Sequence, residues 1–129
     1  MEWTPDLSVG VEQIDNQHKE LISRMNAFFD SMSTDSQAKV MEMLGFLEDY
    51  VITHFKAEEA LQLRYNYPGY AAHRKLHQAF MADVRQLSEN IINGGFTVAT
   101  RSLVGSTLTN WLMLHIRKED KAVGAFIRG

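Results

Sequence analysis

The sequence predicts an all-α protein, an antiparallel up-down-up-down four-helix bundle with a short N-terminal arm. Three observations support this prediction. Only two prolines, Pro5 and Pro68, occur among the 129 residues. The long stretches between turn signals are rich in Leu, Met, Ala, Glu, Gln and Lys, which favour helix over strand. Each stretch carries apolar residues at three- and four-residue spacing, as amphipathic helices do.

Turn signals divide a single domain, residues 1–129, into the arm and the helices. The arm covers about residues 1–13 and contains the first proline. Three breaks follow, at Ser33-Thr34-Asp35-Ser36, Asn66-Tyr67-Pro68-Gly69 and Asn93-Gly94-Gly95. In the first break, Thr34 followed by Gln37 has the spacing of a capping box. Because the loops are short, consecutive helices should be antiparallel neighbours. The predicted helices cover roughly residues 15–32, 36–65, 70–92 and 96–126.

Each predicted helix has one face on which the apolar residues recur, and this face should be buried in the bundle. The four faces, in chain order, are Ile14, His18, Leu21, Met25, Phe28, Phe29 and Met32; Val40, Leu44, Leu47, Val51, His54, Glu58 and Leu61; Tyr70, His73, His77, Phe80, Val84, Leu87 and Ile91; and Val104, Leu108, Trp111 and His115.

Composition excludes several classes of function. Hydrophobic residues make up 45% and charged residues 22%, which is typical of a soluble globular domain. The net charge of −3 argues against nucleic acid as the main partner. Without cysteine, the chain has no disulfides, thiolate zinc sites, cysteine-ligated iron–sulfur clusters or thiol nucleophiles. We find no secretory signal and no apolar run long enough to span a membrane, so a cytoplasmic location is expected.

All five histidines fall on the apolar faces. A lone histidine there is more often a hydrogen-bonded core residue than a metal ligand, at roughly three to one. Five buried imidazoles each need a polar partner, however, and a shared metal would satisfy all of them together. The candidate ligands are His18, His54, His73, His77 and His115.

Two pairs of these residues have the spacing that lets both side chains reach one ion. His73 and His77 are four residues apart, about 40° around a helix, and so are His54 and Glu58. An acidic residue on an apolar face needs a compensating cation. The alternative for Glu58 is a surface glutamate paired with Arg64 or Lys56.

Asp120 needs a further assumption to join the same cluster. It follows His115 by five residues, about 140° around a regular helix, so the two side chains should diverge. A π-bulge near residues 115–120 would align them, as would an oblique crossing that lets Asp120 reach inward. The alternative is an exposed acid beside Lys118 and Lys121.

Five imidazoles and two carboxylates are too many donors for one ion and suit two. The absence of thiolates disfavours copper(I) and structural zinc, and the mixed nitrogen and oxygen donors favour non-heme iron, with manganese as the alternative. Two octahedral ions offer about twelve positions, of which these donors and one bridging solvent oxygen fill about eleven. One position remains for a small diatomic molecule.

The ordered motifs resemble those of the bacterial hemerythrins over nearly the whole chain. They are Ile14-Asp15-Asn16-Gln17-His18, the block His54-Phe55-Lys56-Ala57-Glu58-Glu59, the pair His73 and His77, and Trp111-Leu112-Met113-Leu114-His115-Ile116 followed by Asp120.

This resemblance implies a cofactor of two non-heme iron ions and a division of the ligands between them. His73, His77 and His115 would hold one iron, and His18 and His54 the other. Glu58 and Asp120 would bridge the two ions together with an oxo or hydroxo group. Five side chains near the ligands resemble the apolar oxygen pocket of the family, although they could equally be ordinary core: Leu21, Phe55, Trp111, Leu112 and Ile116.

The resemblance further implies reversible dioxygen binding for storage, transport or delivery, without catalysis. An oxygen-consuming enzyme would be a suitable recipient. The alternatives are an oxygen, redox or nitric oxide sensor or scavenger using the same site, an enzyme that turns over peroxide, and a metal-free helical interaction module. Polar outer faces favour a monomer.

Overall fold

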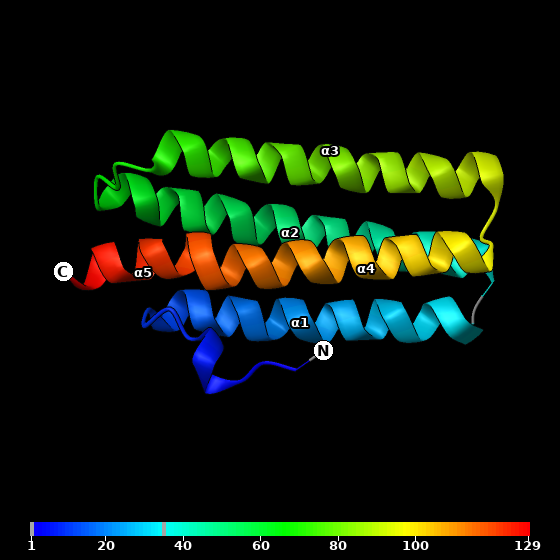
Figure 1. Cartoon of the computed structure of the whole chain (residues 1–129), viewed down its shortest axis with the longest axis horizontal. Coiled ribbons are helices and arrows are strands. Elements are labelled where there is room, and N and C mark those ends of the chain that lie inside the picture. Colours follow the sequence, from blue (N-terminus) through cyan, green and yellow to red (C-terminus); the bar gives the residue numbers. More distant parts are fainter. Residues whose placement is uncertain (1, 35) are drawn as a thin grey trace.

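The computed structural model describes residues 2–34 and 36–129 and places four long helical rods side by side (Figure 1). Helix α1 spans Glu12–Thr34, α2 spans Gln37–Arg64, α3 spans Tyr70–Gly94 and α4 spans Val98–Leu114. A π-helical segment, His115–Asp120, leads from α4 into α5, Lys121–Arg128, so these three form the fourth rod. Rods that follow one another in sequence pack together and run in opposite directions. The predicted four-helix bundle is confirmed.

The helix ends differ slightly from the predicted ones. Helix α1 begins at Glu12, earlier than predicted, and the fourth rod continues to Arg128. The predicted capping box at Thr34 is wrong. Ser36 caps α2 instead, and its side chain accepts a hydrogen bond from the backbone N–H of Lys39 at 3.3 Å. An N-cap needs extended backbone, which Ser36 has, whereas Thr34 is still part of α1.

The N-terminal arm is fastened to the first turns of α1. Ser8 Oγ donates a hydrogen bond to Asp15 Oδ2 at 2.6 Å, and the backbone N–H of Val9 donates to Asp15 Oδ1 at 2.8 Å. Gly10 then turns the chain into the helix with φ of +78°, a conformation that favours glycine. These contacts hold the arm against one end of the bundle, where Val9 is buried.

Buried apolar residues form two separate clusters along the rods. The larger cluster fills most of the bundle, and the smaller one joins Val9, Ile14 and Val123 at the end that the arm and α5 close. On α1, His18 lies between Ile14 of the small cluster and Leu21 of the large one. The histidines therefore lie inside the bundle with apolar packing on both sides of them along its axis.

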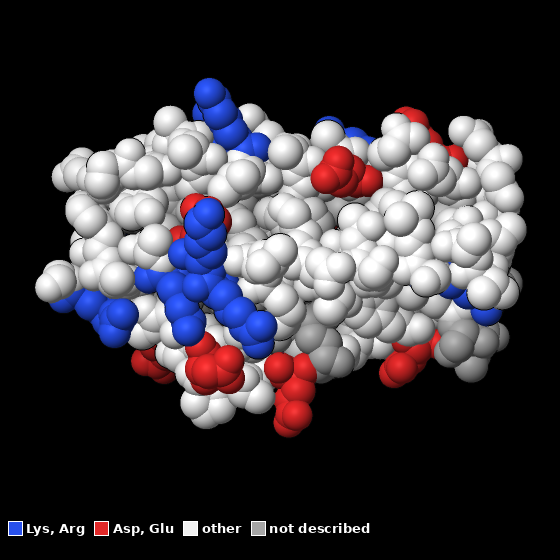
Figure 2. All heavy atoms as spheres, viewed as in Figure 1, with Lys and Arg blue, Asp and Glu red and all other residues white. Residues whose placement is uncertain are grey.

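The outer surface is mixed in character. On the face shown in Figure 2, basic and acidic side chains are interspersed toward the end that carries the arm and α5, while the centre of the face is largely uncharged. Helix α4 accounts for much of that centre, because Arg101 is its one charged residue. No helix in the described part of the chain is both long and apolar enough to cross a membrane.

Candidate metal centre

Seven ionisable side chains converge inside the bundle, and every rod contributes at least one of them. Each is at most 5% exposed. Glu58 is fully buried, so it is not the surface glutamate paired with Arg64 or Lys56 that the sequence left open. The seven are His18 from α1, His54 and Glu58 from α2, His73 and His77 from α3, and His115 and Asp120 from the π-helical segment.

The predicted distortion near residues 115–120 is confirmed, because His115–Asp120 is a π-helical segment. In a π-helix the backbone hydrogen bonds join residues five apart, which brings such residues onto the same side. His115 Nε2 lies 3.1 Å from Asp120 Oδ1 as a result, and Asp120 is 1% exposed. The alternative of an exposed acid beside Lys118 and Lys121 is excluded.

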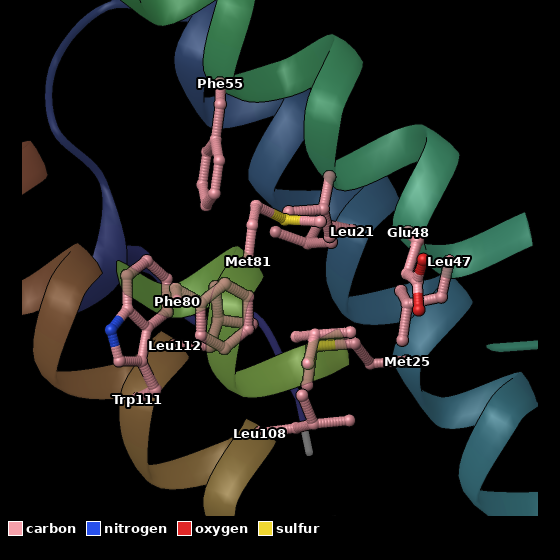
Figure 3. A pocket seen from close by; sticks show the side chains of 12 residues that line it. Leu21, Met25, Leu47, Glu48, Phe55, Phe80, Met81, Leu108, Trp111 and Leu112 are labelled. Atoms are coloured by element: carbon pink, nitrogen blue, oxygen red, sulfur yellow. The ribbon is translucent and has the colours of Figure 1, made fainter. Parts of the chain in front are cut away.

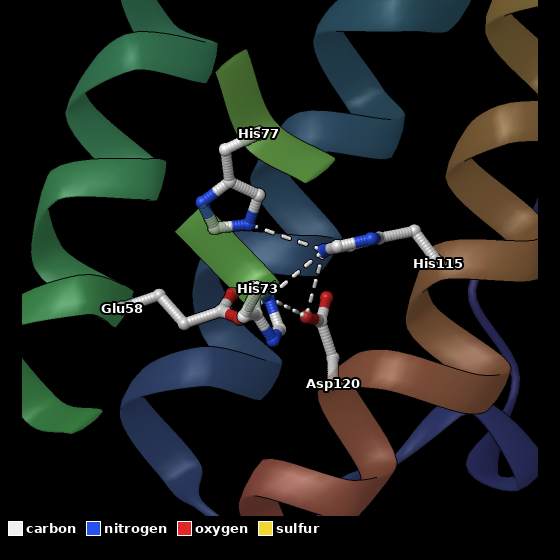
Figure 4. Close-up of side chains that lie close together, drawn as sticks. All are labelled: Glu58, His73, His77, His115 and Asp120. Carbon is white, nitrogen blue, oxygen red and sulfur yellow. Dashed lines mark hydrogen bonds and ion pairs between the residues drawn. The ribbon is translucent and has the colours of Figure 1, made fainter. Parts of the chain in front are cut away.

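The donor atoms fall into two groups that share both carboxylates. Within each group, one donor atom from every residue lies within 4.8 Å of the others. Figure 4 shows the first group, in which the side chains point toward one another from three rods. The first group is Glu58, His73, His77, His115 and Asp120, and the second is His18, His54, Glu58 and Asp120.

Hydrogen bonds within the first group cannot satisfy its inner nitrogen atoms. His115 Nε2 lies 3.1 Å from His77 Nε2 and 3.0 Å from His73 Nε2, so three ring nitrogens compete for few protons. Facing lone pairs repel each other, and a cation between them removes the repulsion.

The second group leaves buried atoms unpaired as well. His18 Nε2 lies 2.9 Å from Asp120 Oδ2, and His54 Nε2 lies 3.2 Å from Glu58 Oε2. Neither contact is a hydrogen bond, however, and among the described residues His18 Nε2, Glu58 Oε2 and both carboxylate oxygens of Asp120 are buried without a hydrogen-bond partner. Such unpaired groups are costly, and metal ions would pair all of them at once. The donor set therefore fits metal cations.

Protonation in the metal-free protein follows from burial and the two carboxylates. Burial lowers the pKa of His73, but the carboxylates of Glu58 and Asp120, 2.7 and 3.1 Å from its Nε2, outweigh burial and raise it to about 9. Burial, together with the neighbouring charges of His73 and His115, lowers the pKa of His77 to about 2. His77 is therefore neutral and ready to bind a metal, whereas a metal ion must displace a proton from His73.

Three polar residues around the cluster were missed by the sequence analysis. Gln17 Oε1 lies 2.7 Å from His54 Nδ1, and Glu59 Oε2 lies 2.9 Å from His77 Nδ1. Buried Gln62 donates through Nε2 to a carboxylate oxygen of the cluster at 3.4 Å. Burial raises the pKa of Glu59, and the guanidinium group of Arg74 opposes that shift. Adjacency to a predicted ligand in sequence was the signal that could have revealed Gln17 and Glu59.

An apolar cavity lies next to the cluster, between the rods (Figure 3). Four of the five side chains expected around an oxygen pocket line it: Leu21, Phe55, Trp111 and Leu112. The fifth, Ile116, is fully buried in the large apolar cluster but is not among the residues that line this cavity. The cavity is small, with room for about one water-sized molecule.

Two aromatic side chains connect the cavity to the cluster by stacking on its imidazoles. The ring of Phe55 lies parallel to that of His77, with centroids 3.7 Å apart. Trp111 stacks on His115 at 4.3 Å and on Phe80 at 3.9 Å. These contacts fix the orientation of two imidazoles and leave an apolar surface beside them.

Comparisons with known proteins agree with this geometry. Residues 9–127 match the family described as hemerythrin HHE cation binding domain. The bacteriohemerythrin of Pseudomonas paraeruginosa is 32% identical over 118 residues, covering 92% of this chain and 75% of that protein. The bacteriohemerythrin of Methylococcus capsulatus is 30% identical over 125 residues, covering 96% and 94%. The crystal structure of a wild-type hemerythrin superposes with a TM-score of 0.85 at 30% identity, covering 100% of this chain and 98% of that one. The chain belongs to the hemerythrin family.

Proposed function

We propose that this protein binds dioxygen reversibly at a pair of non-heme iron ions and stores, carries or delivers the gas. The observation that carries the proposal is the pair of donor groups that share Glu58 and Asp120 beside an apolar cavity. Similarity to bacteriohemerythrins supports the same activity.

The ligand assignment follows the two groups. His73, His77 and His115 hold one ion, and His18 and His54 hold the other. Glu58 and Asp120 belong to both groups and would be shared by the two ions, and one position would have three histidines and the other two. The short contacts between each carboxylate and imidazoles of both groups support this assignment.

Two ferrous ions in this arrangement supply the electrons for reversible dioxygen binding. The protein itself contributes by excluding water. The apolar side chains that line the cavity keep water from the gas-binding position, because water and protons promote oxidation of the iron. They include Leu21, Phe55, Trp111 and Leu112.

The ligand set favours binding over turnover. Di-iron enzymes built on helical bundles use carboxylate-rich shells with Glu-x-x-His pairs three residues apart. Here the pairs are His54 with Glu58 and His73 with His77, four residues apart, and neutral imidazoles outnumber carboxylates. Less anionic charge is available to stabilise high-valent iron, so dioxygen is held rather than cleaved.

The test is reconstitution with ferrous iron under nitrogen, followed by oxygen and then nitrogen again, with absorbance recorded at each stage. We expect two iron ions per chain, a visible band on exposure to oxygen and its loss under nitrogen. Failure to take up two ions, or a colour change that nitrogen does not reverse, contradicts the proposal.

Leu112 allows a prediction for the cavity wall. It is 3% exposed, and Leu112→Ala enlarges the cavity beside the cluster. We expect iron content to remain at two ions per chain while oxygen dissociation and autoxidation become faster, measured by stopped-flow absorbance. Leu103→Ala is the control, because Leu103 lies on the same helix and is 50% exposed. If oxygen dissociation and autoxidation were unchanged in Leu112→Ala, Leu112 would not form part of the gas-binding pocket.

A further inference from the structure

The outer nitrogen of His77 faces a carboxylate that is not part of the cluster. Glu59 Oε2 lies 2.9 Å from His77 Nδ1, across the interface between α2 and α3. An ionised carboxylate can only accept a hydrogen bond, so the ring N–H at Nδ1 donates it. This contact leaves the lone pair on Nε2, the atom that points into the cluster 3.1 Å from His115 Nε2.

Three other cluster histidines, His18, His54 and His73, have no anionic partner at the outer nitrogen among the described residues. His54 Nδ1 contacts a neutral amide oxygen, Gln17 Oε1, at 2.7 Å. Nδ1 of His73 and Nδ1 of His18 are buried without a hydrogen-bond partner in the part of the chain that the structure describes. The two donor groups therefore differ in the charge around them, with the extra carboxylate on the side of His77.

Glu59 is held in place well enough to exert a constant effect. Its side chain is only 19% exposed, so it has little room to leave His77 Nδ1, and the 3.7 Å ion pair with the exposed Arg74 adds little restraint. The imidazole that it contacts is also fixed from the other direction, because the ring of Phe55 stacks on His77. Rotation of the imidazole would break both contacts.

A charged acceptor at Nδ1 makes an imidazole a stronger ligand. It draws the N–H proton toward itself, which increases the negative charge on the ring and the basicity of Nε2. A neutral amide does the same more weakly. A metal ion held by His77 should gain more from this effect than an ion held by His18 and His54.

We propose that Glu59 is a positioning residue that acts through His77 and makes the metal position of His73, His77 and His115 the tighter of the two. This inference rests on the ligand assignment given under the proposed function. It assigns a role to a residue that lies outside the donor set and predicts that the two metal ions bind with separate affinities.

The test is a Co²⁺ titration of the metal-free protein, followed by absorbance with a competing chelator. Glu59→Gln keeps an oxygen acceptor for His77 Nδ1 and removes only the charge. We expect the wild-type protein to bind two ions in two steps and the variant to lose about 10–100-fold in affinity at the tighter step alone. Glu42→Gln is the matched control, because Glu42 lies on the same helix, pairs with Lys39 at 3.6 Å and is 54% exposed.

Arg74→Gln should change metal affinity in the opposite direction to Glu59→Gln. Arg74 partly neutralises Glu59, so its removal should strengthen the tighter step, by up to about fivefold for an exposed ion pair. If the Glu59 and Arg74 pair served only to hold α2 against α3, both variants would weaken metal binding. Circular dichroism melts show whether each variant is folded before titration.

The outcomes separate the two proposals. A wild-type protein that does not bind two Co²⁺ ions contradicts the proposed function. A wild-type protein that binds two ions, with Glu59→Gln indistinguishable from it, overturns the role of Glu59 alone. Weaker binding in both Glu59→Gln and Arg74→Gln also overturns it.

Discussion

His77→Ala is expected to reduce the iron content of the loaded protein from two ions per chain to one. The substitution removes a neutral imidazole whose Nε2 points into the cluster and whose pKa of about 2 keeps it free of a proton. The position that loses it would retain His73, His115 and a share in two carboxylates. The other position keeps all four of its donors, so its ion should remain.

The measurement is elemental analysis of iron per chain after anaerobic loading and gel filtration. Gln78→Ala is the control, because Gln78 is the next residue on α3 and is exposed. Replacement of His77 also leaves a gap beside the ring of Phe55, so the thermal midpoint of the metal-free variant should be compared with that of the metal-free wild type. Retention of two ions with unchanged oxygen binding would show that the ligand assignment is wrong.

Gly124→Ala is expected to destabilise the end of the bundle that encloses the cluster. Gly124 is buried on α5, and a Cβ atom added there would overlap the backbone oxygen of Val9. Because backbone cannot yield as a flexible side chain does, the arm must move away from α5. We expect a loss of about 1–3 kcal/mol in the free energy of unfolding, measured by urea denaturation.

Gly45→Ala is the matched control and should increase the free energy of unfolding rather than decrease it. Gly45 lies within α2, and an added Cβ atom would meet nothing within 4 Å. Alanine in a helix interior is more stable than glycine by about 0.5–1 kcal/mol, so this variant should gain stability. If Gly124→Ala were as stable as the wild type, the close contact between α5 and the arm would not contribute to folding.

Displacement of the arm should also affect the cluster. Ser8 and Val9 are hydrogen-bonded to Asp15, which lies one turn before His18 on α1. Val9 and Val123 belong to the small apolar cluster on that side of the histidines. Loss of this packing would admit water near His18 and Asp120, so faster loss of iron to a chelator should accompany the loss of stability.

Much of the site could be predicted from the sequence because helices have a fixed period. Residues four apart lie on one face, so His54 with Glu58 and His73 with His77 had to point the same way. The same period exposed the misfit between His115 and Asp120, five residues apart, and so predicted the distortion found there. The helix ends were less predictable, as Ser36 shows, because capping depends on where one helix stops extending.

The surroundings of the cluster could not be predicted in this way. Glu59 and Gln17 lie off the apolar faces, and each contacts a histidine on a neighbouring helix. Their contacts depend on the rotation and the axial offset of two packed helices, which local periodicity does not specify. Ile116 is a similar case: the resemblance placed it around the pocket, whereas the structure buries it in the core without making it part of the cavity wall.

The amino-acid pattern by itself therefore determined the four rods, their antiparallel order and the five inward-facing histidines, because each of these depends on backbone geometry within one helix or one short loop. It left open whether Glu58 and Asp120 face inward, and the structure buries both. Tertiary structure alone decided how the donors divide into two groups sharing Glu58 and Asp120, and which outer residue contacts which imidazole. These arrangements depend on side-chain rotamers and on distances of a few ångströms between rods, which are set only when the helices pack.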